Sequence, residues 1–160
     1  MYFLTEIELI DFEVSETLSP KRFKLVSRCA NEKDRSTAEI LQVLKKLDSN
    51  DRRQAVKGLL HFLKLAQLGS PFNQLADKKV VHEAFKSFYC ETTKRNETVW
   101  RYRHGDIRIL FYYGVDKIVL LANALPKRSN KLSVKDENQA RQTVNDFLVA
   151  SQNDSGIVWI

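Results

Sequence analysis

Hydrophobic residues recur along this chain with two different periods, and these periods predict which segments are strands and which are helices. An alternation of period two indicates half-buried strands, whereas a spacing of three and four residues indicates amphipathic helices. Strands are predicted over 6–14, 22–29 and 117–125, and helices over 36–47, over 52–68 and from 135 or 136 onward. Since helices and strands are not regularly interleaved, we expect an α+β fold in which a helical hairpin and a C-terminal helix pack on one antiparallel β-sheet.

Turn and cap residues sharpen the boundaries of the first two helices. Ser36 or Thr37 is a candidate N-cap of the first, and the polar segment 48–51 ends it and offers a new cap for the second. Gly69, followed by Pro71, ends the second helix. The short connection between the two helices predicts an antiparallel hairpin. Residues 72–97 are less regular, and their part 80–89 fits a strand or a short helix equally well.

The segment 99–113 alternates cations with apolar and aromatic residues and predicts a β-hairpin. Gly105-Asp106 is a favoured pair for its turn. If these two residues form the whole loop, Arg103 pairs with Arg108, and side-chain alternation gathers three arginines on one face. These are Arg101, Arg103 and Arg108, and Trp100, Tyr102, Ile109 and Phe111 fall on the other face. Because directly opposed cations repel, we expect this face to bind an anion.

Composition and charge narrow the class of protein and its partners. A chain of 160 residues with 43% hydrophobic content forms one ordinary globular domain. The net charge of +6 and the pI near 9.3 favour RNA, DNA, an anionic membrane or an acidic protein as partner. The first residues do not resemble a signal peptide, and no apolar run approaches the length of a membrane span. We therefore expect a cytoplasmic protein that does not contact a membrane.

Few residues suggest a metal or a cofactor. Cys29 and Cys90 lie far apart and match no zinc-ligand spacing, and the histidines are isolated in the sequence. The chain also lacks a glycine-rich phosphate loop and a nucleophile elbow. We expect reduced thiols, no bound metal and no cofactor.

Four short motifs, taken in order, resemble the RelE/HigB superfamily of bacterial and phage toxins, and in particular its phage-derived, HigB-like branch. They are Leu65-Ala-Gln-Leu-Gly-Ser-Pro71, Arg101-Tyr-Arg103, Arg108-Ile-Leu-Phe-Tyr112 and Pro126-Lys-Arg128. The resemblance covers residues 36–150. It implies a RelE-like fold, with residues 1–35 as an N-terminal extension and 151–160 as a short tail whose end, 157–160, could dock on a sheet edge.

The resemblance implies the toxin of a type II toxin–antitoxin system, an endoribonuclease that cuts mRNA on the ribosome without a metal. The ribose 2′-hydroxyl attacks the adjacent phosphate, and a small helix-turn-helix antitoxin neutralises the enzyme in a hetero-oligomer. Arg108 matches the arginine that stabilises the transition state, and Arg128 matches a cation that contacts the scissile phosphate. Arg101 stands where the family often has a lysine proposed to activate the 2′-hydroxyl. Since arginine is effectively never deprotonated, Arg101 would act by its charge.

The group that transfers protons is less well defined. Val134 occupies a position at which some family members have a catalytic side chain, so His104, near the hairpin turn, is the candidate acid or base. The alternative is a solvent-facing turn histidine, and His61 and His82 are interpreted as structural. Arg103, Lys127 and Tyr112 are candidate RNA-binding residues, with Tyr112 stacking on a base. The departures at positions 101 and 134 also permit a non-cleaving relative, either a DNA gyrase poison or a phage-encoded binding protein.

Overall fold

The computed structural model describes residues 1–16, 18–128, 131–154 and 156–160. Its strands are β1 (Tyr2–Glu6), β2 (Lys24–Cys29), β3 (Val81–Glu83), β4 (Phe88–Cys90), β5 (Arg95–Glu97), β6 (Trp100–His104), β7 (Ile107–Tyr113), β8 (Ile118–Pro126) and β9 (Ile157–Trp159). Its α-helices are α1 (Glu39–Lys46), α2 (Ser49–Ala66), α3 (Phe72–Leu75) and α4 (Val134–Ser151), and two 3₁₀ turns are η1 (Leu9–Phe12) and η2 (Arg35–Thr37). This inventory confirms the α+β class.

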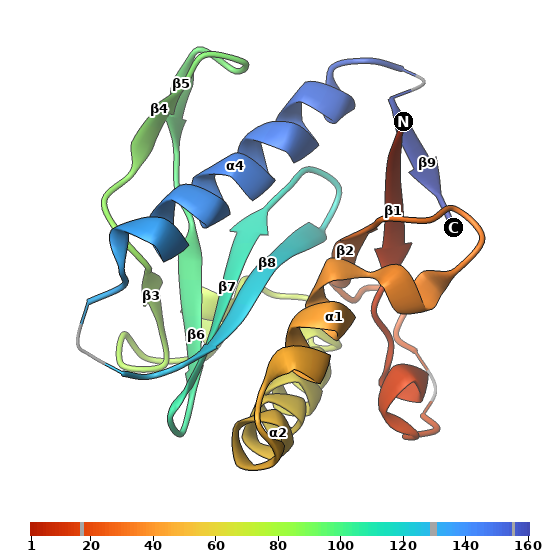
Figure 1. The fold of residues 1–160 in the computed structure, drawn as a ribbon, viewed down its shortest axis with the longest axis vertical. Helices are drawn as coiled ribbons and strands as arrows, with labels where there is room; N and C mark the ends of the chain where they lie inside the picture. The colour runs from red at the N-terminus through yellow and green to blue at the C-terminus, as the bar shows by residue number, and fades with distance from the viewer. Residues whose placement is uncertain (17, 129–130, 155) are drawn as a thin grey trace.

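One seven-stranded sheet organises the molecule, with strand order β3-β6-β7-β8-β2-β1-β9 (Figure 1). Most neighbouring strands are antiparallel, but β2 runs parallel to β8 and β1 runs parallel to β9. The sheet is therefore mixed, and the expectation of a purely antiparallel sheet is wrong. Strands β4 and β5 form a separate two-stranded hairpin. Parallel pairs join segments distant in the sequence, which local hydrophobic patterns do not reveal.

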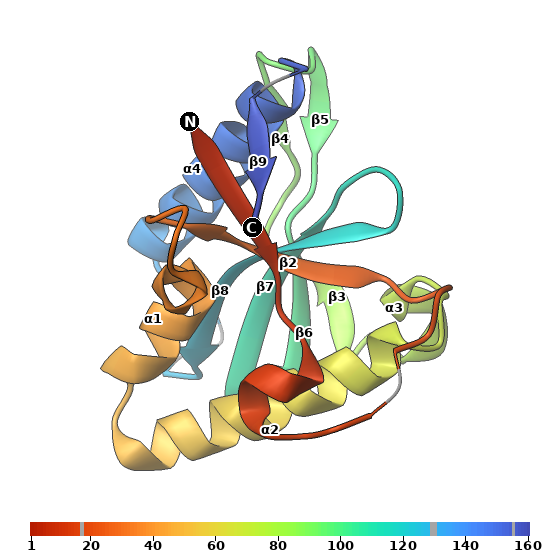
Figure 2. The ribbon, with the colours of Figure 1, turned by 90° about the vertical axis from the view of Figure 1, so that its right-hand side faces the viewer.

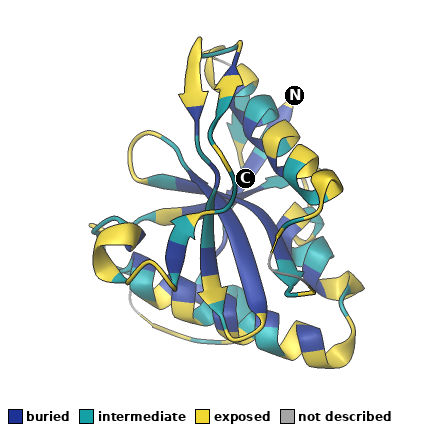
Figure 3. Cartoon of the chain, turned by 90° about the vertical axis from the view of Figure 1, so that its left-hand side faces the viewer, coloured by how far each residue is buried: buried dark blue, intermediate teal, exposed yellow. Residues whose placement is uncertain are grey.

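Helices cover both faces of the central strands and create two hydrophobic cores. Ile109 and Phe111 belong to the core on the α1–α2 side, whereas Leu110 and Tyr112 belong to the core on the α4 side. Figure 1 shows α4 lying across β6, β7 and β8, and Figure 2 shows α2 running below the strands. Buried residues accordingly concentrate in the central strands (Figure 3). The burial of β8 on both faces confirms the interpretation of its continuous apolar run.

The structure corrects two expectations near the N-terminus. The strand predicted over 6–14 is wrong: β1 covers Tyr2–Glu6 instead. Beyond it, Asp11 accepts a hydrogen bond from the Glu8 amide (2.8 Å) and the chain turns into η1. The candidate caps Ser36 and Thr37 lie in η2 and do not cap α1. Asp34 accepts a hydrogen bond from the Ser36 amide instead, so an aspartate outside the predicted segment sets this turn.

Other boundaries follow the sequence. The Asp48 side chain caps α2 by accepting a hydrogen bond from the Asp51 amide, 2.9 Å away. Gly69 follows α2 with a left-handed φ of 77°, as expected of a residue that ends a helix. The two terminal strands lie side by side in Figures 1 and 2, because β9 pairs in parallel with β1. The predicted docking of 157–160 on a sheet edge is thus confirmed, and 1–35 supplies β1 and β2.

The described helices also bear on membrane insertion. None of them combines the length and the apolar character that a transmembrane helix needs.

Candidate functional site

The β6–β7 hairpin has the predicted register. His104 pairs with Ile107 and Arg103 with Arg108, so Gly105-Asp106 forms a two-residue loop, with φ of 56° at Gly105. Cross-strand partners share a face, and alternation places Arg101 on that same face. The apolar partners on the opposite face, Tyr102, Ile107, Ile109 and Phe111, belong to the core beneath α1 and α2. The predicted arginine face is confirmed, and it lies on the α4 side of the sheet.

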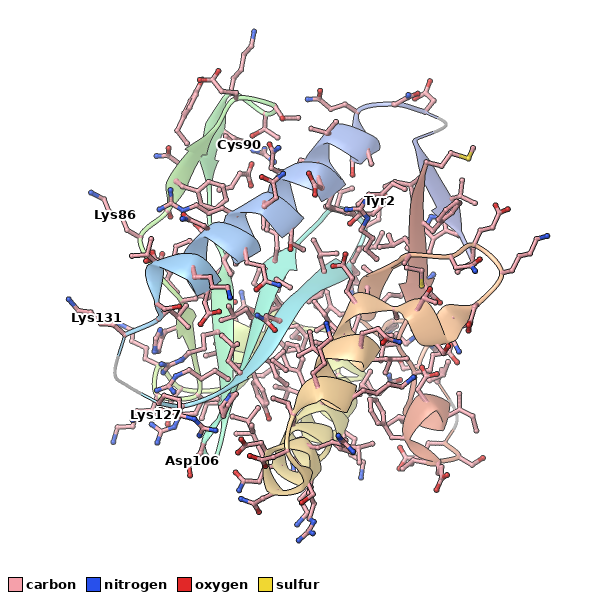
Figure 4. All side chains as sticks on the ribbon, in the orientation of Figure 1. Tyr2, Lys86, Cys90, Asp106, Lys127 and Lys131 are labelled. Atoms are coloured by element: carbon pink, nitrogen blue, oxygen red, sulfur yellow. The ribbon has the colours of Figure 1, made fainter. Side chains whose placement is uncertain are left out.

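A cavity of ≈ 310 Å³ opens on this face. Its walls come from β3, β6 and β7, from the C-terminal end of β8 and from the segment that leads into α4. The site residues predicted from the sequence that line it are Arg101, Arg108, Lys127 and Arg128. Figure 4 shows that Lys127 lies near Asp106 at the hairpin tip, with Lys131 close to the start of α4. The fold therefore gathers four of the seven predicted site residues in one cavity.

The three hairpin arginines lack anionic partners among the described residues. Arg108 is only 6% exposed, and its pKa is lowered by burial and by the charge of Arg103, partly offset by Asp106. Burial, followed by the charges of Arg108 and Arg103, also lowers the pKa of Arg101. In the described part of the chain, none of these three arginines forms an ion pair. The hairpin thus concentrates positive charge that no ion pair among the described residues compensates.

Arg101 carries a second sign of a missing partner. Its Nε is buried and has no hydrogen-bond partner among the described residues. A buried donor without a partner loses its interaction with water and gains nothing in exchange, which costs about 1–3 kcal/mol. An anion in the cavity would supply the countercharge that the Arg101 guanidinium lacks.

Two contacts hold the segment that carries Lys127 and Arg128 near the hairpin and α2. The Lys127 amide donates to the Asp106 carbonyl, 2.6 Å away. Arg128 Nη2 donates to Asp51 Oδ2 at 2.7 Å, and because the Arg128 side chain is 68% exposed, its remaining guanidinium donors can reach a ligand. The rest of the predicted basic loop, residues 129 and 130, lies outside the described residues.

The cavity contains two titratable groups that sequence reasoning did not place there. His82 of β3 is the cross-strand partner of Arg101, and Asp136 lies in the first turn of α4, where its amide donates to Ser133 Oγ. Both residues line the cavity. The sequence contains no local signal that places His82 or Asp136 in this site. His82 lies in the segment whose secondary structure the sequence leaves undecided, and Asp136 is typical of the first turn of a helix.

His104 lies away from this cavity. Its ring stacks on that of His61 of α2, with 4.6 Å between the ring centroids, and a methyl group added at Gly58 would lie 3.2 Å from His104 Cβ. Burial, then the charges of His61 and Lys57, lowers the His104 pKa. His104 alternates with Tyr102 along β6 and so faces α2, on the opposite side of the sheet from the arginines. The expectation that His104 supplies the acid or base has no support in this geometry.

Tyr112 lies on the predicted face but is 5% exposed. Its hydroxyl donates to Glu97 Oε2, and Glu97 Oε1 accepts from Arg95 (2.7 Å) and Thr93 (3.0 Å). Burial alone would raise the pKa of Glu97, but these hydrogen bonds together lower it. The ring of Tyr112 offers no free face to a base, so its position does not support a stacking role. Arg103 is exposed beside the cavity, where it can contact a longer ligand.

Within the described ranges, no three His, Cys, Asp or Glu side chains gather in a way that could hold a metal ion. Cys29 and Cys90 are free thiols, and both are buried. Taken together, the site offers clustered guanidinium and ammonium groups, a histidine and a carboxylate. This set is suited to binding a phosphodiester and to charge stabilisation during its cleavage. No protein-family model matches the chain, and no curated protein matches its sequence.

Proposed function

We propose that this chain is an endoribonuclease of the RelE/HigB type, a toxin that cuts mRNA on the ribosome. One observation carries the proposal: Arg101 and Arg108, both without an anionic partner among the described residues, share a cavity with Lys127 and Arg128. The sequence motifs add the class of reaction and of partner. The cognate antitoxin would then be a small protein that covers this basic face with acidic or helical segments.

The chemistry explains why cations are the main requirement. RNA carries its own nucleophile, since the 2′-hydroxyl lies beside the phosphate that it attacks. The protein has to align these groups and stabilise the negative charge that grows on the phosphorus oxygens. The planar fork of arginine matches phosphate oxygens better than the point charge of lysine. The burial of Arg108 strengthens its interaction with that charge, because the local dielectric is low.

Each site residue then has a distinct part in the reaction. Arg108 stabilises the transition state, and Arg128 contacts the scissile phosphate. Arg101, which lines the cavity, acts by its charge. Lys127 and Arg103 bind the phosphates on either side of the scissile one. The net charge of +6 strengthens the attraction to mRNA and to ribosomal RNA.

The experiment that tests this proposal compares the wild type with Arg108→Ala after induced expression. Transcripts are mapped by primer extension, and growth is followed in parallel. Lys33→Ala, which removes a charge from an exposed turn between β2 and η2, serves as the matched control. We expect cuts within translated reading frames that Arg108→Ala reduces by about 10²–10³-fold and that the control retains. Growth arrest with intact mRNA would contradict the proposal, and accompanying DNA damage would identify a gyrase poison instead.

A further inference from the structure

His82 lies where the proposed reaction needs a proton acceptor. It is paired with Arg101 across the β3–β6 ladder, and its side chain lines the same cavity as Arg101 and Arg108. We propose that His82 is a catalytic residue that removes the proton from the attacking 2′-hydroxyl. This inference rests on the proposed ribonuclease function and deepens it, because it assigns a group that the arginines cannot replace.

The hydrogen bonding of His82 defines which ring nitrogen is the base. Nδ1 lies 2.5 Å from the carbonyl oxygen of Glu83. A carbonyl oxygen only accepts hydrogen bonds, so Nδ1 carries the proton in this contact. In the neutral ring, Nε2 then holds the lone pair. Among the described residues none hydrogen-bonds to Nε2, and it is therefore the atom that accepts the substrate proton.

Several charged groups surround the cavity in which His82 would act. They are Arg101 of β6, Arg108 of β7, Lys127, Arg128 and Lys131 of the segment between β8 and α4, and Asp136 of α4. The cations draw the phosphodiester toward the histidine. Besides His82, Asp136 is the side chain of the cavity that can accept a proton. It is therefore the alternative candidate for the general base.

The step is balanced without a cofactor. The 2′-oxygen forms a bond to phosphorus while its proton moves to His82 Nε2. The bond between phosphorus and the 5′-oxygen breaks, and the leaving 5′-oxygen takes a proton from water. The imidazolium then returns its proton to the hydroxide so formed. The products are a 2′,3′-cyclic phosphate and a 5′-hydroxyl, and the histidine ends the cycle neutral.

The test measures single-turnover cleavage of mRNA on programmed ribosomes as a function of pH. In the wild type we expect the rate to rise with pH as the general base loses its proton. His82→Ala should lower the rate by about 10²–10⁴-fold and abolish the rise. Added free imidazole should restore part of the rate, since it can occupy the vacated space. His61→Gln, at an exposed position of α2, is the matched control and should keep the wild-type profile.

A second substrate separates a base from an acid. When the leaving 5′-oxygen is replaced by sulfur, the leaving group needs no proton, so a defect in a general base persists and a defect in a general acid disappears. A persistent defect in His82→Ala supports the assignment. The assignment is overturned if His82→Ala keeps the wild-type rate and pH profile, if the sulfur substrate removes its defect, or if Asp136→Asn alone abolishes the rise. In those cases, loss of cutting in Arg108→Ala would still support the proposed ribonuclease function. A wild type that does not cut mRNA would overturn both that function and the role of His82.

Discussion

Arg103 and Arg108 are directly paired across the β6–β7 hairpin, and Arg108 is almost completely buried. Two like charges in such a pair repel each other and destabilise the sheet locally. Nearby carboxylates relieve the repulsion only in part, since Asp106 acts on Arg108 at a distance and forms no ion pair with it. This arrangement costs stability in the free protein, and binding of the proposed anion would recover that cost.

Replacing Arg108 with methionine should therefore stabilise the free chain while it destroys activity. Methionine is unbranched and flexible and fills most of the space of the arginine stem. Exchanging a buried, unpaired charge for an apolar side chain relieves both desolvation and repulsion. We expect a gain of roughly 1 kcal/mol, seen as an increase in Tm of about 2–4 °C for a chain of this size. Thermal unfolding followed by circular dichroism measures it.

The control for this variant is Lys33→Met, which removes a charge of the same sign from an exposed turn. It should leave Tm within about 1 °C of the wild type, because most surface substitutions change stability by less than about 0.5 kcal/mol. A lower Tm for Arg108→Met would show that other groups compensate the charge of Arg108 in the free protein. It would contradict the claim that this charge is uncompensated.

Inorganic pyrophosphate should stabilise the wild type by binding in the cavity. A ligand that binds the folded state adds RT ln(1 + [L]/Kd), about 2.7 kcal/mol at a concentration of 100 Kd. Tm measured against inorganic pyrophosphate, with chloride at equal ionic strength as reference, should rise and saturate. Arg101→Ala should abolish the increase, since it removes one of the cations that line the cavity. An equal increase in this variant would place the anion elsewhere.

If the proposed function is correct, Asp51 competes with the substrate for Arg128, and replacement of Asp51 should strengthen anion binding. Arg128 is largely exposed, so its ion pair with Asp51 contributes only about 0–1 kcal/mol to stability. Asp51→Asn should lower Tm by at most a few degrees, including the loss of a favourable charge at the N-terminus of α2. The midpoint of the pyrophosphate titration should move to lower concentration. A midpoint shifted upward would show that Asp51 orients Arg128 productively.

The Glu97 network predicts a specific acid sensitivity. Since the folded-state pKa of Glu97 is lowered, its ionised form stabilises the fold above the unfolded value of about 4.3, and this contribution is lost as pH falls through the folded pKa. Tyr112→Phe removes one donor to the buried carboxylate and should destabilise the protein by about 1–3 kcal/mol at neutral pH.

The pH dependence provides the check on this network. Urea unfolding at pH 7 and at pH 3 should show a smaller loss of stability on acidification in Tyr112→Phe than in the wild type, because the variant has less carboxylate stabilisation to lose. Tyr89→Phe, an exposed tyrosine on the neighbouring β4, should match the wild type at both pH values. An identical loss in Tyr112→Phe and the wild type would mean that the hydroxyl does not stabilise the ionised carboxylate.

The sequence predicted the features that depend on neighbouring residues. The Gly105-Asp106 turn defines the hairpin register, and alternation then places Arg101, Arg103 and Arg108 together. The cap at Asp48 and the end of α2 near Gly69 follow from the same local chemistry. These features are local because a turn or a cap involves side chains only a few residues apart.

Features that depend on contacts distant in the sequence were missed. His82 enters the cavity because β3 pairs with β6, and the short, polar sequence around β3 gives no clear period. Asp136 arrives through the packing of α4 on the sheet. The position of His104 was accessible from the sequence, because alternation with Tyr102 already assigns it to the other face. His104 was expected near the arginines because it is close to them in the sequence. Adjacent residues of a strand, however, point to opposite faces of the sheet.

The central claim, that the unpaired arginines of the cavity cut RNA, is tested most directly with purified protein. Wild type and Arg108→Met are incubated with ribosomes translating a defined mRNA, and the 3′ ends of the products are identified chemically. We predict cuts by the wild type that end in a 2′,3′-cyclic phosphate, and about 10²–10³-fold fewer cuts by the better-folded Arg108→Met. Intact mRNA with the wild type, or equal cutting by both proteins, would contradict the claim.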